Sequence, residues 1–179
     1  MEPGICYRLW TENEQAALTP RRPPEILHAD LAPLLLDLAG WGATDPSELS
    51  WLTQPPAGAV AQAKDLLIRL GALDAAGRIT SHGTRMAEFP LHPRLSHMLL
   101  QAIPMQCAGL ACDVAALLGE RDLLRGPSSA KHVDIRIRLD ALDGEPTPID
   151  GSTIDRGTLQ RVKHTAALWR RQLLRSVDH

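Results

Sequence analysis

Aromatic residues are scarce in this chain of 179 residues, which has four Trp, one Tyr and one Phe. Proteins that hold single-stranded nucleic acid by stacking its bases need several aromatic side chains on one surface. The composition therefore argues against a recognition surface built in that way. Leu and Ala must fill most of the core, which a chain of this length is able to bury.

Cysteine is also rare, and long apolar runs are missing. The three cysteines, Cys6, Cys107 and Cys112, include no CxxC pair, and their odd number argues against a disulfide framework. No stretch approaches the roughly 18 uninterrupted apolar residues of a membrane-spanning helix, and the N-terminus lacks the features of a secretory signal. We therefore predict a soluble, cytoplasmic protein that makes no contact with a membrane.

The net charge of −2 lacks the positive excess that is typical of a dedicated nucleic-acid-binding domain. The charges are unevenly distributed, however. Residues 1–90 hold seven Lys and Arg against eleven Asp and Glu, whereas residues 91–179 hold twelve against ten. Six basic residues fall between Asp155 and Arg175, against one acidic residue. An electrostatic binding surface is therefore expected near the C-terminal end of the sequence.

Short catalytic motifs are absent as well. The sequence has no GxxxxGK[ST] phosphate loop, no GxSxG elbow and no HExxH pair. A zinc site is not indicated, because the side chains of Cys107 and Cys112 would project about 140° apart on one helix. Several histidines occur singly, which predicts surface or core positions for them: His28, His82, His132 and His164. The residues alone nominate no catalytic centre, metal or cofactor.

The first 24 residues are not expected to form a domain. Large side chains alternate over residues 4–10, which predicts a strand, and a Pro-rich stretch follows at residues 19–24. A strand needs a partner for its backbone groups, and the sequence shows none for this one. We therefore expect residues 1–24 to be the remnant of a neighbouring domain and its linker.

The next segment begins with two predicted helices. Apolar residues recur at helical spacing over residues 26–38 and again over residues 57–70. Pro33 is expected to kink or break the first helix. Gly40 and Gly71 are expected to end the two helices in a left-handed conformation.

A predicted hairpin follows these helices. Residues 72–80 place short apolar segments on either side of a turn with Gly77, and Thr80 or Ser81 can cap a further helix. Helices followed by a hairpin wing and another helix are typical of a winged-helix domain, which we place at residues 25–90. Its net negative charge predicts that it binds protein and does not enter the major groove of DNA.

The remaining residues, 91–179, are predicted to be helical. Residues 105–118 are apolar nearly all round, which predicts the central buried helix of a bundle. Residues 131–142 and 159–173 each place apolar residues on one face, as its neighbours would. We therefore predict a mainly α fold, in which a winged-helix domain with a small β-hairpin wing precedes a helical bundle domain.

The last predicted helix carries a basic face. Its members are Arg156, Lys163 and Arg170, which stack at seven-residue spacing, and Arg161, Arg171 and Arg175. Such a face can neutralise phosphates, although a charged face is often only solvated. Residues 120–122, with the sequence Glu-Arg-Asp, form either a salt-bridge corner that pairs internally or, through Arg121, a contact to a ligand or another domain.

Five short segments, taken in their order along the chain, match the motifs of a known family. They are DPSELSWLTQPP at residues 45–56, LGALD at 70–74, GRITSHG at 77–83, MAEFPLHPRLSHML at 86–99 and ERDLL at 120–124. The middle three resemble the wing and the following corner of the C-terminal region of DEAH-box helicases. The first resembles the beginning of that family's winged helix, and the last is similar to its bacterial HrpB-type branch. The resemblance covers most of residues 4–175.

This resemblance implies a piece of an ATP-dependent RNA helicase. Residues 1–24 would be the end of the second RecA-like domain and a linker, residues 25–90 the winged helix, and residues 91–179 the helical ratchet domain. The family's phosphate loop, DEAH box and arginine-rich motif do not occur in this sequence. The implied ATP and magnesium therefore belong to the motor of the full-length helicase, and the chain alone is expected to be inactive.

The resemblance also implies partners. The chain would pack on the RecA-like motor domains of the same polypeptide and help to hold single-stranded RNA or DNA during unwinding, through backbone contacts that carry little sequence information. The residues expected to contact the strand are Arg94, His97, Arg121, Arg136 and Arg138, and those expected to attract it are Arg156, Lys163 and Arg170. The alternative is a free-standing winged-helix module that binds nucleic acid or protein, since fold does not determine function.

Overall fold

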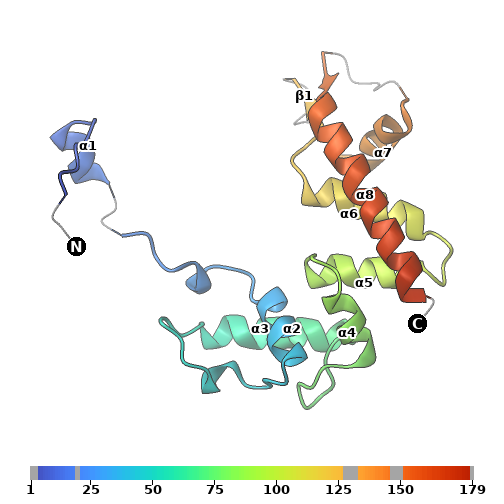
Figure 1. The fold of residues 1–179 in the computed structure, drawn as a ribbon, viewed down its shortest axis with the longest axis horizontal. Helices are drawn as coiled ribbons and strands as arrows, with labels where there is room; N and C mark the ends of the chain where they lie inside the picture. Colours follow the sequence, from blue (N-terminus) through green and yellow to red (C-terminus); the bar gives the residue numbers. More distant parts are fainter. Residues whose placement is uncertain (1–3, 19–20, 127–132, 146–150, 178–179) are drawn as a thin grey trace.

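The computed structural model describes residues 4–18, 21–126, 133–145 and 151–177, and the fold is mainly helical, as predicted (Figure 1). The elements are α1 (Glu12–Ala17), η1 (Glu25–Leu27), α2 (Ala32–Gly40), η2 (Pro46–Glu48), α3 (Ala57–Arg69), α4 (Ser81–Ala87), α5 (Pro93–Ala102), α6 (Ala108–Gly119), β1 (Leu124–Arg125), α7 (Ile135–Asp143), β2 (Thr153–Ile154) and α8 (Arg156–Val177). None of these helices is both long and apolar enough to cross a membrane.

The N-terminal segment with α1 stands apart from the rest of the molecule in Figure 1. Residues 4–10 form no strand, so that prediction is wrong. A strand exists only where a neighbour completes its hydrogen bonds, and in the described part of the chain nothing pairs with this segment. Its large side chains lie in solvent, with Ile5 84% and Leu9 95% exposed. Helix α1 begins at a capping box between Thr11 and Glu14.

The winged-helix unit, residues 25–90, is built from α2, α3 and α4, and α2 packs on both of the other helices. Leu35, Leu67 and Met86 contribute one buried side chain from each helix to its core. The buried residues of this unit and of the following helices form one continuous cluster. The domain boundaries therefore stay predictions, because no break in the core marks them.

The ends of α2 differ from the prediction. Pro33 lies in the first turn of α2 and does not kink it, because the fixed φ and missing N–H of proline suit that position. The longer predicted helix is thus divided into η1 and α2. Gly40 is the last helical residue, and the left-handed residue is Gly42 at φ 91°, so the assignment to Gly40 is wrong. Gly71, at φ 70°, ends α3 as predicted.

The wing is shorter than a full hairpin. Leu73 and Ile79 form a single antiparallel bridge. The side chain of Thr80 caps α4 as predicted, because its oxygen accepts the Gly83 N–H at 3.0 Å. A Cβ on Gly83 would lie 2.2 Å from the carbonyl oxygen of Ala72. The wing therefore packs so closely on α4 that only glycine fits at this position.

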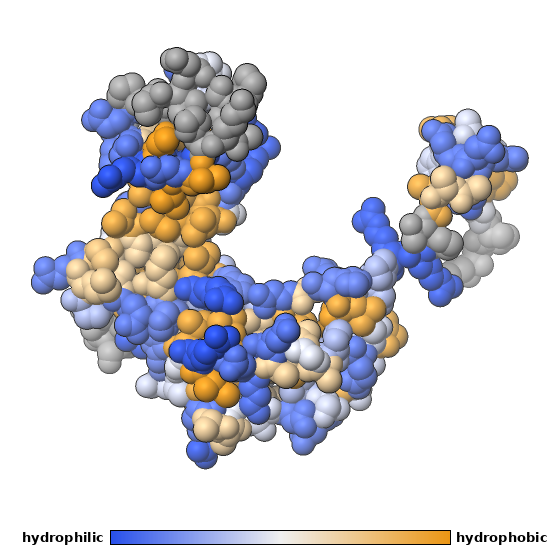
Figure 2. Space-filling model, turned by 180° about the vertical axis from the view of Figure 1, so that it is seen from behind, coloured by the Kyte–Doolittle hydropathy of each residue, from blue (hydrophilic) through white to orange (hydrophobic). Residues whose placement is uncertain are grey.

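The helical unit, residues 91–177, is centred on α6 and α8. Cys112 and Val162 are fully buried on these two helices, which pack on each other. The prediction that residues 105–118 form a helix buried all round is wrong in part, since Leu110 is 53% and Leu118 59% exposed. Hydrophobic residues accordingly form much of the middle of this unit in Figure 2. Helices α5, α7 and α8 pack on α6, but they do not cover Leu110 and Leu118.

Helices α5 and α7 complete this unit. Helix α5 packs against α2 and α4 on one side and against α6 on the other, so it connects the two units. Helix α7 begins after Asp134, whose side chain accepts the Arg136 N–H. The first residues of the predicted helix at 131–142, residues 131 and 132, lie outside the described residues.

Candidate nucleic-acid interface

Figure 1 shows β1 near the start of α8, at one end of the helical unit. Several arginines belong to β1, to α7, to the start of α8 and to the loop after α6. Three of them form ion pairs that join the loop after α6 to α7 and α8, and join β1 to the start of α8. These pairs are Arg161–Glu120 at 3.2 Å, Arg138–Asp122 at 2.6 Å and Arg125–Asp155 at 3.2 Å. They fix the geometry of this end of the bundle, which we call the arginine end.

Two aspartates at the arginine end, Asp155 and Asp122, have lowered pKa values. Asp155 Oδ1 accepts the Thr158 N–H at 2.9 Å, which caps α8. This backbone bond, and then the Arg125 side chain, hold the pKa of Asp155 below its ordinary value, although burial acts in the opposite direction. Burial also raises the pKa of Asp122, but bonds from Arg138 and from a backbone N–H outweigh it and lower that pKa overall. These carboxylates are therefore ionised at neutral pH and neutralise their arginines.

Three arginines at this end remain without an ion pair among the described residues: Arg121, Arg136 and Arg156. All three side chains are exposed. Each lies near a residue of the ion-paired corner in sequence. The two neighbours of Arg121 pair with α8 and α7, and Arg156 directly follows the aspartate that pairs with β1. Arg136 lies two residues before Arg138 on α7 and therefore on another face of that helix. The arginine end thus offers three free guanidinium groups, which can bind phosphates.

The ion pairing expected within residues 120–122 is wrong, because Glu120 pairs with Arg161 of α8 and Asp122 pairs with Arg138 of α7. The residue between them, Arg121, is left exposed. Arg138 is 12% exposed and also donates to the Asp134 carbonyl oxygen at 3.0 Å, so it holds the corner together. A contact of Arg138 with nucleic acid stays a prediction.

The other basic residues of α8 lie further along the helix. Lys163 is exposed and forms no ion pair among the described residues. Arg170 binds the Asp113 carboxylate and donates to the Gly109 carbonyl oxygen at 3.4 Å, so it ties α8 to α6. Burial raises the pKa of Asp113, and Arg170 opposes this shift. Of the predicted stripe, Arg156 and Lys163 are therefore free, and Arg170 is engaged.

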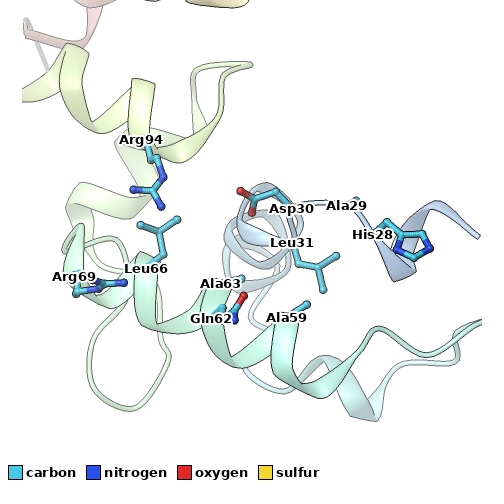
Figure 3. A pocket seen from close by; sticks show the side chains of 10 residues that line it. All are labelled: His28, Ala29, Asp30, Leu31, Ala59, Gln62, Ala63, Leu66, Arg69 and Arg94. Atoms are coloured by element: carbon cyan, nitrogen blue, oxygen red, sulfur yellow. The ribbon is translucent and has the colours of Figure 1, made fainter.

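Arg94 lies on α5, at the edge of a groove of about 470 Å³ (Figure 3). The floor of the groove is apolar and includes Leu31 and Ala63, and Arg69 lies on its rim. Arg69 pairs with Asp65 at 2.7 Å. Asp30 also lines the groove and offsets the charge of Arg94, so the groove is close to neutral, and it is a site distinct from the arginine end.

The structure contains two histidine contacts that the sequence did not predict. His97, one of the predicted contact residues, lies 2.9 Å from His82, measured between Nδ1 and Nε2. His82 is thus a partly buried residue with a hydrogen-bonding partner, in agreement with the predicted surface or core position. His92 lies 3.0 Å from Asp30. These partners are 15 and 62 residues apart, so no local spacing indicates them. Within the described ranges, no group of three or more His, Cys, Asp or Glu is placed to hold a metal ion.

Known proteins share this arrangement. The profile of the family described as "Helicase associated domain (HA2), winged-helix" matches residues 65–91, which hold the end of α3, the wing and α4. The ATP-dependent RNA helicase HrpB of Escherichia coli (strain K12) is 40% identical over 120 residues, which are 67% of this chain and 15% of that protein. This chain matches the C-terminal region of HrpB-type DEAH-box helicases. The family predicted from the sequence is thereby confirmed.

Other relatives extend the match to this HrpB-type region. The probable ATP-dependent RNA helicase DHX35 of Homo sapiens is 35% identical over 135 residues, which are 75% of this chain and 19% of that protein. A crystal structure of the E. coli DExH-box NTPase HrpB has a TM-score of 0.63 and 30% identity, covering 95% of this chain and 19% of that one. The chain therefore spans less than a fifth of the length of these helicases, and it corresponds to an accessory region of them.

Proposed function

We propose that this chain is an accessory module of an ATP-dependent RNA helicase, which packs on the motor domains of the same polypeptide and helps to hold single-stranded RNA or DNA during unwinding. The observation that carries the proposal is the 40% identity with the E. coli ATP-dependent RNA helicase HrpB across 67% of the chain. ATP and magnesium would be bound by the motor. The composition, with its odd number of cysteines, favours the cytoplasm as the compartment.

The free guanidinium groups of the arginine end support the contact with nucleic acid. Arg121, Arg136 and Arg156 are exposed, and none of them forms an ion pair within the described ranges that an approaching phosphate would have to break. Contacts of this kind bind the backbone of any sequence and weaken as salt rises, because they release condensed counterions. The module would thus position a strand and perform no bond chemistry.

Exposed apolar side chains of the N-terminal segment support the packing on a motor. Ile5 and Leu9 are 84% and 95% exposed, and Tyr7, which lies between them, is 81% exposed. Large apolar residues grouped in this way are typical of surfaces that another domain covers.

A salt series tests the nucleic-acid contact. Fluorescence anisotropy measures the affinity of the chain for a single-stranded RNA, and the triple variant R121A/R136A/R156A is compared with the wild type. Each phosphate contact on a single strand contributes about 0.7 to the slope of log affinity against log salt, so loss of three contacts should lower the slope by about 2. The control is R8A/R21A/R22A, which removes the same charge from exposed residues of the N-terminal segment.

The comparison has a clear negative outcome. An unchanged slope in the arginine-end variant, or an equal loss in the control, would show that these residues do not hold the strand. Tighter binding of duplex DNA by a dimer would instead favour the free-standing winged-helix module.

A further inference from the structure

Three basic side chains meet where α4 packs on α5. His82 Nε2 and His97 Nδ1 are 2.9 Å apart, and their rings lie edge to face with centroids 5.1 Å apart. Arg85 lies on α4, three residues after His82, so the two residues are neighbours on the helix surface. All three side chains are partly buried. The contact between the winged-helix unit and α5 thus contains a cluster of basic groups, which we call the α4–α5 basic cluster.

This cluster has no acidic partner among the described residues. None of the ion pairs of the structure includes His82, Arg85 or His97. Burial lowers the pKa of His82, and the positive charges of His97 and Arg85 lower it further. No carboxylate acts on His82 in the opposite direction. Burying several basic groups together without an anion is unusual, because like charges repel and lose hydration.

One donor of the cluster is also unsatisfied. The Nε–H of Arg85 is buried and has no hydrogen-bond acceptor among the residues that the structure describes. A buried donor without an acceptor costs free energy comparable to a lost hydrogen bond, so most such groups have a partner. The missing partner of Arg85 would therefore be an acceptor, and the positive charge of the guanidinium favours an anion in that place.

We infer that the α4–α5 basic cluster binds a phosphate group. A phosphate monoester or inorganic phosphate carries up to two negative charges and offers three or more strong acceptor oxygens, enough for the Arg85 guanidinium and both imidazoles, whereas a backbone phosphodiester offers one negative charge and two non-bridging oxygens. The two histidines would exchange their mutual hydrogen bond for bonds to the anion, since a protonated imidazole donates from both nitrogens.

The phosphate can come from free phosphate or a nucleotide, or from the backbone of a nucleic acid. In the second case the inference deepens the proposed function and rests on it, because His97 is one of the expected contact residues. The cluster is nevertheless formed by α4 and α5, whereas the arginine end is formed by the loop after α6 and by α7 and α8. Each site can therefore fail without the other.

Histidine ring signals of the full chain, measured by NMR, test the inference. Inorganic phosphate is titrated at about pH 6.5, near the ordinary pKa of histidine, with ionic strength held constant by chloride. We expect saturable shifts of the His82 and His97 signals and little change at His164, which is exposed on α8. The variant R85Q should raise the dissociation constant about tenfold or more, as expected for the loss of a charge-assisted hydrogen bond.

Two further variants keep the test sharp. R22Q removes an exposed arginine of the N-terminal segment and should leave the phosphate titration unchanged. H97Q removes one ring and should weaken binding even if R85Q fails to fold. Equal, non-saturating shifts at all histidines, or a dissociation constant that R85Q and H97Q leave unchanged, would overturn the inference.

A second titration with a single-stranded RNA distinguishes the two sources of phosphate. Shifts of the His82 and His97 signals at RNA concentrations well below those needed for inorganic phosphate would assign the site to the nucleic-acid backbone. Shifts with inorganic phosphate alone would assign it to free phosphate or a nucleotide. If the arginine-end variant loses RNA binding while the cluster shows no phosphate shift, the proposed function stands and this inference fails.

Discussion

Replacing Gly83 with alanine should destabilise the chain, although the same change inside a helix ordinarily stabilises it. The new Cβ would lie 2.2 Å from the carbonyl oxygen of Ala72 and 2.8 Å from a side-chain carbon of Ile79. Overpacking of this kind costs about 2 kcal/mol. The Ala72 carbonyl also accepts the Thr80 N–H at 2.9 Å, and displacing it weakens that bond by about 1 kcal/mol. The higher helix propensity of alanine returns about 1 kcal/mol, so the net loss is about 2 kcal/mol.

Urea unfolding followed by circular dichroism measures this loss. With a slope of about 2 kcal/mol per molar urea, the midpoint of G83A should fall by about 1 M. The matched control is G58A in α3, where a Cβ would meet nothing within 4 Å, and this variant should be as stable as the wild type or more so. A G83A variant as stable as the wild type would refute the close packing of the wing on α4.

Two other groups give predictions of a different kind. Burial raises the pKa of the Cys112 thiol to about 11. At about pH 8 an alkylating reagent should therefore modify the exposed Cys6 and reach Cys112 only after unfolding. Equal modification rates of the two cysteines in the folded chain would contradict this prediction. The pKa of Asp155 is lowered, first by the Thr158 N–H and also by Arg125, so its contribution to stability is present above the unfolded pKa of about 4 and disappears as pH falls through the folded pKa. The variant D155N should therefore melt at a lower temperature than the wild type at neutral pH, and this difference in melting temperature should shrink in acid. A difference that stays constant with pH would show that the lowered pKa has no effect on stability.

Local patterns predicted the helices well. The apolar stripe of α8 is one example, since Val162 and Trp169 are buried as the spacing indicates. The cap at Thr80 is another, because a cap depends only on the residues that follow it. These features were predictable because the interactions that create them lie within one or two helical turns.

Features that depend on distant residues were not predictable. The alternation of residues 4–10 resembles that of a strand, but alternation does not provide the pairing partner that a strand requires. Arg138 pairs with Asp122, 16 residues away, and His97 contacts His82 across two helices. The sequence therefore identifies the basic residues but not their partners. It cannot show which basic side chains remain free to contact nucleic acid.

The position of α5 has a mechanical consequence. Because α5 packs on α2, α4 and α6 at once, and because Leu99 and Leu100 are buried in the core that runs through both units, no soft joint separates the wing from the arginine end. A rotation of one unit against the other would open apolar contacts and expose them to water. The winged-helix unit and the helical unit should therefore move as one rigid body. A displacement of the winged helix would then move the arginine end by a similar rotation, without bending between the two units.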